Sequence, residues 1–486
     1  MELQFHKTPA ICLDQVVCER TARELTQELK LSEDMPDAGA VICAWGQILI
    51  RGKHWDSDSV GSSGGVQVWV LYTSEDGSEH RVVETWLPFE QSWELSDPVE
   101  DGKILLIPAL NHVDARVVSQ RKLMIKVSMG ICCKAFISDS IDIYTPGAMP
   151  EDVQLLVREW SALIPSEVGE RAFVIDEEII VPTDLPKPEK LICCTLIPLV
   201  NESKVMAGKL VFRGSGHVHM IYQTGDRLYT MDMDVPFAQY SELEGDYDPD
   251  ATVSVFPVLT SFEAELSDEG VLRLKAGLLG QYIACDKRDL KVVEDAYSTQ
   301  NQIVVNTAAV KLSHVAQQRQ WTVTAQNPAD LEGKTIDTVF YGEMPKILGD
   351  GSDKKEQFTG RFQRLYYDND GILRCDSGKW EQIEPVKQSQ MPMTDLAIEQ
   401  VSEGEAQIRM NTLVLERESK EIVCGITMGD ALLKDPSRPS LVLRRMGEES
   451  IWELAKRTGS TVSDIQKIND LDTEPEPGTM LILPVQ

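Results

Sequence analysis

The chain has few basic side chains, no long apolar run and no clustered cysteines. Its 47 Lys and Arg face 78 Asp and Glu, which gives a net charge of −31. Nucleic acid and anionic lipid bind mainly through cationic side chains, so this balance argues against both partners. No apolar run approaches the ~18 residues that a membrane span needs. Residues 1–17 also lack the order of a secretory signal, so we expect a cytoplasmic protein without membrane insertion.

The ten cysteines show no C-x-x-C spacing. Cys132-Cys133 and Cys193-Cys194 are neighbours within apolar runs, and the others lie singly and far apart. Zinc sites need clustered ligands, and disulfides are rare in a cytoplasm. We therefore expect buried, reduced thiols, with no metal and no cofactor.

No segment carries a convincing catalytic constellation. A phosphate-binding G-x-x-x-x-G-K loop is missing, so the chain is not itself an ATPase. Gly61–Gly65 fits G-x-S-x-G, but a nucleophile elbow needs a strand before it and a helix after it. Here a polar run precedes and a strand follows, so we expect a hairpin loop. Acidic runs such as Asp176–Glu178 indicate solvated surface charge, and we expect no enzyme.

Two histidines lie close together in the sequence. His217 and His219 are two apart on an expected strand, so both face one side of it. They could form half of a metal site, but no third ligand is indicated nearby. We expect two solvated strand histidines, and their role stays open.

A comparison of the chain with itself indicates a duplication. The 42% hydrophobic content predicts a folded chain, whose 486 residues suffice for about three or four domains. Val41–Cys43 recurs as Leu191–Cys193, and Val66–Tyr72 recurs at Gly216–Tyr222, both shifted by 150 positions. A constant shift over such a distance predicts two copies of one domain.

A third copy is fainter. Lys334–Ile336 echoes Lys190–Ile192, and Tyr366–Gly371 copies the spacing of Tyr72–Gly77, an Asp-Gly hairpin signal. We place the three copies at 10–145, 165–297 and 315–430. Short alternating runs bounded by Gly, Asp and Pro predict a mainly β fold, with each copy an antiparallel sandwich or barrel-like domain. We also expect a short helix over Asp152–Ile164 and a linker at Lys434–Ser440.

The residues from 441 to 486 predict a separate small α+β domain. Leu441–Leu443 reads as a strand, and Ser450 with Glu453 forms a capping box for a first helix. A second helix is expected from Thr461, and Met480–Leu483 reads as a closing strand. The order is strand, helix, helix, strand. Its expected core consists of Ile451, Leu454, Ala455, Ile465 and Ile468.

This order and these residues resemble the LysM domain. Glu448–Ala455 matches the family's first turn and helix, Ile465–Leu471 its second helix, and Pro477-Gly478 its last turn. The resemblance implies binding of N-acetylglucosamine polymers, such as peptidoglycan or chitin, through two loops beside the helices. Glu448 and Glu449 replace the family's usual Gly-Asp, however, and burying unpaired carboxylates against a neutral sugar is costly. The residues expected to bind a partner are Glu448, Glu449, Ser450, Trp452, Asn469, Asp470 and Leu471.

The Trp452 side chain has two interpretations. Its position on the first helix predicts a partly exposed ring, which would suit an interface anchor. Alternatively, the ring packs along the first strand of the module.

The copies resemble the SPOCS domain, the spore-coat assembly domain of clostridia and related spore formers. The first match runs over Glu19–Ile50 and the second over Glu170–Val200. Repeated SPOCS-like units followed by a LysM domain resemble a family of spore-coat morphogenetic proteins. This resemblance implies a LysM domain that binds protein. Its partners would be the basement-layer ATPase on the forespore and other coat proteins, reached from the mother-cell cytoplasm.

Two classes of function remain. The first is a non-enzymatic scaffold of the spore coat or envelope. The alternative is a glycan-binding protein of the cell wall or spore cortex. Without an expected secretory signal the scaffold is favoured, because peptidoglycan lies outside the compartment where the chain is made. The sequence leaves open which surface of the copies binds, the oligomeric state and any residual glycan affinity of the LysM-like domain.

Overall fold

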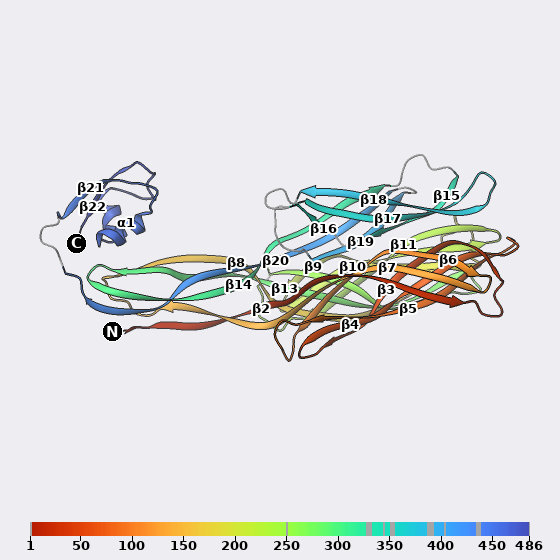
Figure 1. Cartoon of the computed structure of the whole chain (residues 1–486), viewed down its shortest axis with the longest axis horizontal. Coiled ribbons are helices and arrows are strands. Elements are labelled where there is room, and N and C mark those ends of the chain that lie inside the picture. The colour runs from red at the N-terminus through yellow and green to blue at the C-terminus, as the bar shows by residue number, and fades with distance from the viewer. Residues whose placement is uncertain are drawn as a thin grey trace.

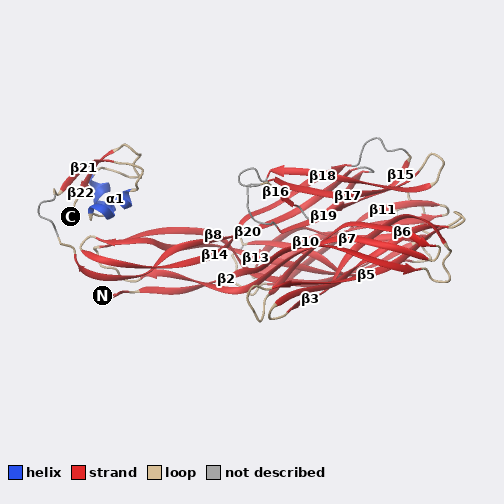
Figure 2. Cartoon of the chain, in the orientation of Figure 1, coloured by secondary structure: helices blue, strands red, loops and turns tan. Residues whose placement is uncertain are grey.

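The structure is a computed structural model that describes residues 2–248, 251–326, 333–343, 346–349, 355–385, 393–402, 405–433 and 439–485. Antiparallel strands make up almost all regular structure in these ranges, which confirms the expected mainly β fold. Figure 2 shows strands throughout the body and helices in the C-terminal module. Within the described ranges, no helix has both the length and the apolar character to cross a membrane.

Residues 5–146 form a pair of three-stranded sheets, here called unit 1. Its strands are β2 (Phe5–Lys30), β3 (Ala38–Trp55), β4 (Ser59–Ser74), β5 (His80–Glu94), β6 (Lys103–Ser119) and β7 (Lys122–Pro146). β3, β4 and β5 form one sheet in chain order, and the other sheet has the order β2-β7-β6. Apolar side chains from both sheets, including Val66 and Ile125, form one core.

Two further segments repeat this pairing of strands, and the second of them adds a short extra strand, β16. Unit 2 consists of β8 (Val153–Ile180), β9 (Lys190–Met206), β10 (Lys209–Thr224), β11 (Arg227–Glu242), β12 (Thr252–Leu266) and β13 (Val271–Ser298). Unit 3 consists of β14 (Asn301–Gln326), β15 (Lys334–Gly342), β16 (Lys346–Leu348), β17 (Lys355–Tyr367), β18 (Leu373–Pro385), β19 (Met393–Ser402) and β20 (Glu405–Ala431). In each unit the long first strand pairs with the long last strand. β1 (Glu2–Leu3) pairs with β20.

The expected helix over Asp152–Ile164 is wrong. These residues begin β8, which pairs with β13 along its whole length. The buried side chains Trp160, Ala162 and Ile164 alternate with a period of two, as strand residues do. The apolar spacing was compatible with a helix, but backbone partners from β13 decide for the strand. Consequently the first strands begin at Phe5, Val153 and Asn301, ahead of the starts expected at 10, 165 and 315.

The hairpin loop expected at Gly61–Gly65 is also wrong. The segment lies inside β4 and pairs with both β3 and β5. A Cβ atom on Gly64 would lie 2.2 Å from the Leu49 carbonyl oxygen, and one on Gly65 would lie 2.3 Å from the Trp86 ring. The glycines therefore serve close packing of neighbouring residues in the sheet, and Ser63 occupies an ordinary strand position.

The three units share apolar cores. Val66, Val68, Val70 and Tyr72 of β4 face the second sheet of unit 1, as their alternation predicted. The intervening Trp69 and Leu71 are buried as well, in a second core that unit 2 dominates. Leu365 and Leu373 of unit 3 belong to that same core. The sheet β3-β4-β5 is thus covered on both faces, which only neighbouring units make possible.

The long strand pairs of the three units extend together as a stalk (Figure 1). The pairs are β2 with β7, β8 with β13, and β14 with β20. Inside the stalk, side chains such as Ile143, Trp160 and Leu312 come from units 1, 2 and 3 and form a common cluster. Each pair carries at least one register shift, including those at Gln15/Val17, Ala284/Cys285 and Val315/Gln317. Such bulges bend and twist a strand pair locally.

Buried glutamines connect the units through backbone groups. Gln47 of β3 accepts a hydrogen bond from the Leu196 N–H of unit 2 at 3.1 Å. Gln281 of β13 accepts from the Leu106 N–H of unit 1 and donates to the Leu106 carbonyl at 2.8 Å. Gln363 of β17 donates to the Val113 carbonyl of unit 1 at 2.9 Å. Because these bonds are directional, they define how the units are oriented.

We predict that Gln281→Met destabilises the chain while preserving its shape. Methionine fills a similar volume but leaves Leu106 N–H and two carbonyls without their buried partner. The free energy of unfolding should fall by about 3 kcal/mol, since each unsatisfied buried group costs roughly 1–3 kcal/mol. Urea unfolding of the full chain measures this, with Gln302→Met at an exposed position of β14 as the matched control. Equal midpoints for the two variants would contradict the prediction.

Candidate functional site

The C-terminal module consists of two strands and two helices. They are β21 (Leu441–Arg445), α1 (Ile451–Thr458), α2 (Val462–Ile468) and β22 (Met480–Pro484). The strands pair antiparallel, with Leu443 opposite Ile482. This is the strand, helix, helix, strand order expected from the sequence.

Side chains define both ends of α1. The Ser450 hydroxyl accepts from the Glu453 N–H at 3.2 Å, and the Glu453 carboxylate accepts from the Ser450 N–H at 2.8 Å. This is the expected capping box. Gly459 ends the helix with a φ of 69°, a left-handed conformation that glycine adopts without strain.

The module core differs from expectation at one position. Ile451, Leu454, Ala455 and Ile465 are buried, whereas Ile468 is 43% exposed. Ile468 is therefore not a core residue. It occupies the last turn of a seven-residue helix that buries Ile465, while Leu481 and Leu483 of β22 fill the space beneath both helices.

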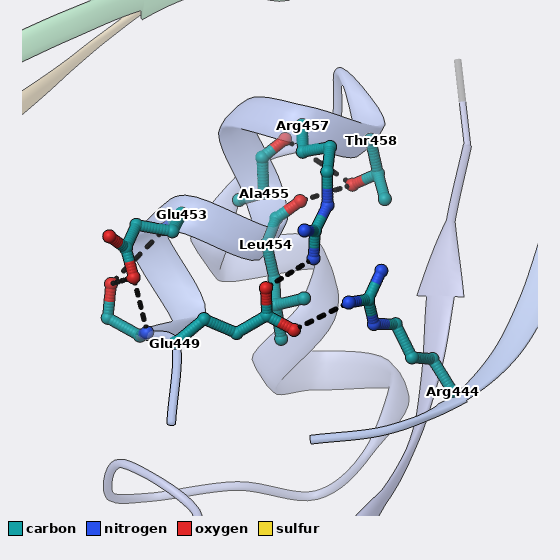
Figure 3. Close-up of polar contacts among 8 residues, drawn as sticks. Arg444, Glu449, Glu453, Leu454, Ala455, Arg457 and Thr458 are labelled. Atoms are coloured by element: carbon teal, nitrogen blue, oxygen red, sulfur yellow. Dashed lines mark hydrogen bonds and ion pairs between the residues drawn. The ribbon is translucent and has the colours of Figure 1, made fainter. Parts of the chain in front are cut away.

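The two glutamates of the first loop have different environments. Glu449 accepts from Arg444 at 2.8 Å and from Arg457 at 2.6 Å, so its carboxylate lies between two guanidinium groups (Figure 3). Its charge is compensated inside the module. Glu448 is exposed and keeps its charge at the surface. Of this pair, Glu448 is the more exposed residue.

In the second loop, Asn469 has a structural role. Its side-chain amide donates to the Ile465 and Ile482 carbonyls, and its oxygen accepts from the Ile482 N–H at 2.7 Å. These bonds tie the end of α2 to β22. Asp470 is exposed with a φ of 51°, and Leu471 packs partly against the module core.

The Trp452 ring is partly buried against the module core and also contacts unit 2. Its centroid lies 4.8 Å from that of Tyr297, near the end of β13, in an edge-to-face arrangement. The indole N–H donates to Asp295 at 2.8 Å. Tyr297 in turn donates to the Ser460 carbonyl at 2.7 Å. The ring therefore links the module to the stalk.

The carboxylate of Asp295 makes the hydrogen bonds at this junction charge-assisted. It also accepts from Lys456 of α1 at 2.7 Å. Burial disfavours the carboxylate, but the bonds from Lys456 and Trp452 outweigh it, so the pKa of Asp295 falls below its ordinary value. The carboxylate stays ionised at neutral pH, and its bonds to the module are stronger for it.

The outer face of the two-stranded sheet is apolar and exposed, which the sequence analysis missed. Leu441 and Leu443 of β21 are 57% and 65% exposed, and Met480 and Ile482 of β22 are 53% and 39% exposed. We call these four residues the outer sheet face. In the sequence, Met480 and Ile482 alternate with Leu481 and Leu483, which face inward. This alternation is the signal that could have revealed the exposed face. Exposed apolar side chains that lie together in this way make the face a candidate interaction site.

His217 and His219 form a buried charge cluster, contrary to the expected solvated positions. The β10–β11 register places Asp234 opposite His217 and Asp232 opposite His219. His219 has Asp232 at 2.8 Å from one ring nitrogen and Asp337 of unit 3 at 3.3 Å from the other. His217 similarly lies between Asp234 at 3.0 Å and Asp232 at 3.4 Å. Hairpin register could have revealed Asp232 and Asp234, whereas Asp337 is 118 residues from His219 in the chain.

This cluster places charged side chains at the contact between units 2 and 3. A carboxylate at each ring nitrogen favours an N–H on both nitrogens, which is the imidazolium form. Burial alone would lower the pKa of His219, but Asp337 and Asp232 outweigh it and raise the pKa to about 10. Among the described residues, no group of three His, Cys, Asp or Glu side chains has the arrangement of a metal site. The cluster is thus an ion-pair network across the junction of two units.

The fold and the module define the class of protein. It is an elongated protein of three two-sheet units, with a small strand-helix-helix-strand module at the end of a stalk. Within that class, residues 188–267 match the family model described as SipL, SPOCS domain. The matched segment contains β9, β10, β11 and β12 of unit 2. No curated protein and no solved structure matches the chain. Unit 2 is thus similar to the SPOCS domain of a SipL-type, spore-coat-related protein.

We predict that Leu454→Ala unfolds the C-terminal module. Leu454 is fully buried, and removing such a side chain from a core costs about 2–5 kcal/mol. Hydrogen exchange on the full chain should show loss of protection in α1, α2 and β22, with the units unaffected. Ile468→Ala is the matched control, because its exposed side chain should cost less than about 0.5 kcal/mol. Similar exchange in both variants would refute the core described here.

We predict that the charged His219 stabilises the chain at neutral pH and less at alkaline pH. Its folded pKa of about 10 lies above the unfolded value of 6.5, so the contribution is full below pH 6.5 and is lost as pH rises towards 10. The unfolding midpoint should fall over this window. In the double variant His219→Gln with Asp337→Asn the fall should be shallower. Identical pH profiles, or a neutral His219 ring by NMR at about pH 7, would contradict this account.

Proposed function

We propose that the chain is a SipL-like, non-enzymatic scaffold of the spore coat or spore envelope. Its three units are proposed SPOCS-like domains, and its C-terminal module is a proposed LysM domain that docks onto the basement-layer morphogenetic ATPase. The observation that carries this proposal is the SPOCS match at residues 188–267. The recurrence of the same strand pairing in units 1 and 3 supports extending it to them. The chain would act at the forespore surface, in the mother-cell cytoplasm.

The shape of the molecule suits a tether. The stalk places the module at one end, away from the broad body formed by the short sheets (Figure 1). Three strand pairs with a shared apolar interior resist bending more than a single flexible linker would. A partner held by the module would thus stand apart from coat proteins that bind the body.

The outer sheet face supports a protein partner for the module. Aliphatic side chains such as Leu443 and Met480 provide apolar area whose burial drives protein association. Glu448 and Arg445 are exposed and supply polar groups at the surface of the module. Such an apolar centre with a polar rim is the usual composition of a protein interface.

The first loop gives a second argument for protein over glycan. The exposed Glu448 would have to lose hydration against a neutral sugar, without a compensating charge. A basic protein surface would instead form charge-assisted hydrogen bonds with it. Glu449 is already paired with Arg444 and Arg457, so we assign it to the stability of the loop.

The proposal predicts that Leu443→Glu weakens binding of the full chain to filaments of the basement-layer ATPase by about tenfold or more. Co-sedimentation or interferometry measures this. Val174→Glu is the matched control, because Val174 is a 57% exposed strand residue of unit 2. Glu448→Lys tests the first loop without breaking the Glu449 ion pairs, and should also weaken binding.

Glycan binding is tested in parallel by calorimetry with N-acetylglucosamine oligomers. Tight sugar binding without ATPase binding would overturn the proposal in favour of a glycan-binding protein of the cell wall or spore cortex. ATPase binding that survives Leu443→Glu would reject the outer sheet face as the docking surface.

A further inference from the structure

Two cysteines from the first and last units meet in the body of the molecule. Cys43 lies on β3 of unit 1, and Cys375 lies on β18 of unit 3. Their sulfur atoms are 3.0 Å apart, although 332 residues separate them in the chain. A disulfide bond is about 2.05 Å long, so an approach of roughly 1 Å would bring the sulfurs to bonding distance.

This pair differs from the cysteine pairs that the sequence makes conspicuous. Cys132 and Cys133 are successive strand residues, whose side chains point to opposite faces of a sheet. They accordingly lie in two different apolar cores. Cys43 and Cys375 come from separate units and face one another. All ten cysteines are free thiols in this structure.

We propose that Cys43 and Cys375 are a redox-sensitive pair that forms a disulfide between units 1 and 3 when the chain meets a small-molecule disulfide. The inference rests on the sulfur geometry and is independent of the proposed function.

The environments of the two sulfurs assign their order of reaction. Cys375 is half-buried at the edge of the shared core, so an oxidant reaches it first. Cys43 is 4% exposed, and its burial raises the pKa of its thiol well above the ordinary value. Cys43 is therefore poorly suited to attack an external reagent. It is placed to resolve a mixed disulfide that forms beside it.

The reaction is a thiol–disulfide exchange in two steps. The Cys375 thiolate attacks one sulfur of glutathione disulfide, forms a mixed disulfide and releases one glutathione thiolate. The Cys43 thiolate then attacks the Cys375 sulfur, which forms the protein disulfide and releases the second glutathione thiolate. The two cysteines lose two protons and two electrons. The oxidant gains both and leaves as two glutathione molecules.

The disulfide would join the first unit of the chain to the last. Units 1 and 3 contact one another through β3 and β18, and unit 2 contacts both within the same core. A covalent bond at this point closes a loop between residues 332 positions apart, which contains all of unit 2. Closing a long loop restricts the unfolded chain, which raises the stability of the folded one. The body would thus gain a covalent link in oxidising surroundings and lose it in reducing ones.

The test is oxidation of the full-length chain with glutathione disulfide, followed by alkylation and a non-reducing digest. We expect a peptide containing Cys43 joined to one containing Cys375, faster migration on a non-reducing gel, and a melting temperature several degrees above that of the reduced chain. Reduction with dithiothreitol should reverse all three changes.

Matched variants make the result specific. Cys375→Ala and Cys43→Ala should each abolish the joined peptide and the rise in melting temperature. Cys18→Ala and Cys424→Ala, at two other half-buried cysteines, should leave both unchanged. A folded chain in which Cys375 stays glutathionylated beside a free Cys43 thiol would overturn the proposal. So would a joined peptide that uses other cysteines.

Discussion

The burial of short sheets on both faces is the constraint on which the rest of the structure depends. In β4, Val68 packs inside unit 1 while its neighbour Trp69 packs into the core shared with units 2 and 3. A unit taken alone would expose the second set of side chains, and burying apolar surface is worth about 25 cal/mol per Å². The three units are therefore parts of one body, and each supplies a surface that the others require.

Apolar burial has no direction, so polar groups must determine how the units are oriented. The buried amides of Gln47, Gln281 and Gln363 each reach the backbone of another unit. His219 and Asp337 add an ion pair between units 2 and 3. Every one of these groups would be costly to bury without its partner. Together they select one arrangement among the many that apolar contact would permit.

The same logic applies to the C-terminal module. Its junction with the stalk consists of a few directional contacts, in which Asp295 receives Trp452 and Lys456. These contacts use one side of α1 and leave the outer sheet face exposed. Trp452 thus contacts the stalk, whereas Leu441, Leu443, Met480 and Ile482 of the strands stay exposed.

The sequence by itself determined whatever depends on local chemistry. The capping box of Ser450 and Glu453, the order of elements in the module, the alternation in β4 and the mainly β fold follow from neighbouring residues. The sequence also contains the alternation of apolar residues with a period of two in Trp160–Ile164, and Asp234 at the position that pairs with His217. Neither could be interpreted without knowing the neighbouring strand. The role of Glu449 likewise depended on Arg444 and Arg457, which the fold brings to it.

Tertiary structure alone decided the contacts between residues far apart in the chain. Nothing near Cys43 in the sequence points to Cys375, nothing near His219 points to Asp337, and nothing near Trp452 points to Asp295. Ile468 has the same apolar character as Ile465, and only the position of β22 leaves one exposed and the other buried. The physical reason is that side-chain chemistry specifies what a group can bind, whereas the packing of distant strands specifies which group is there to be bound.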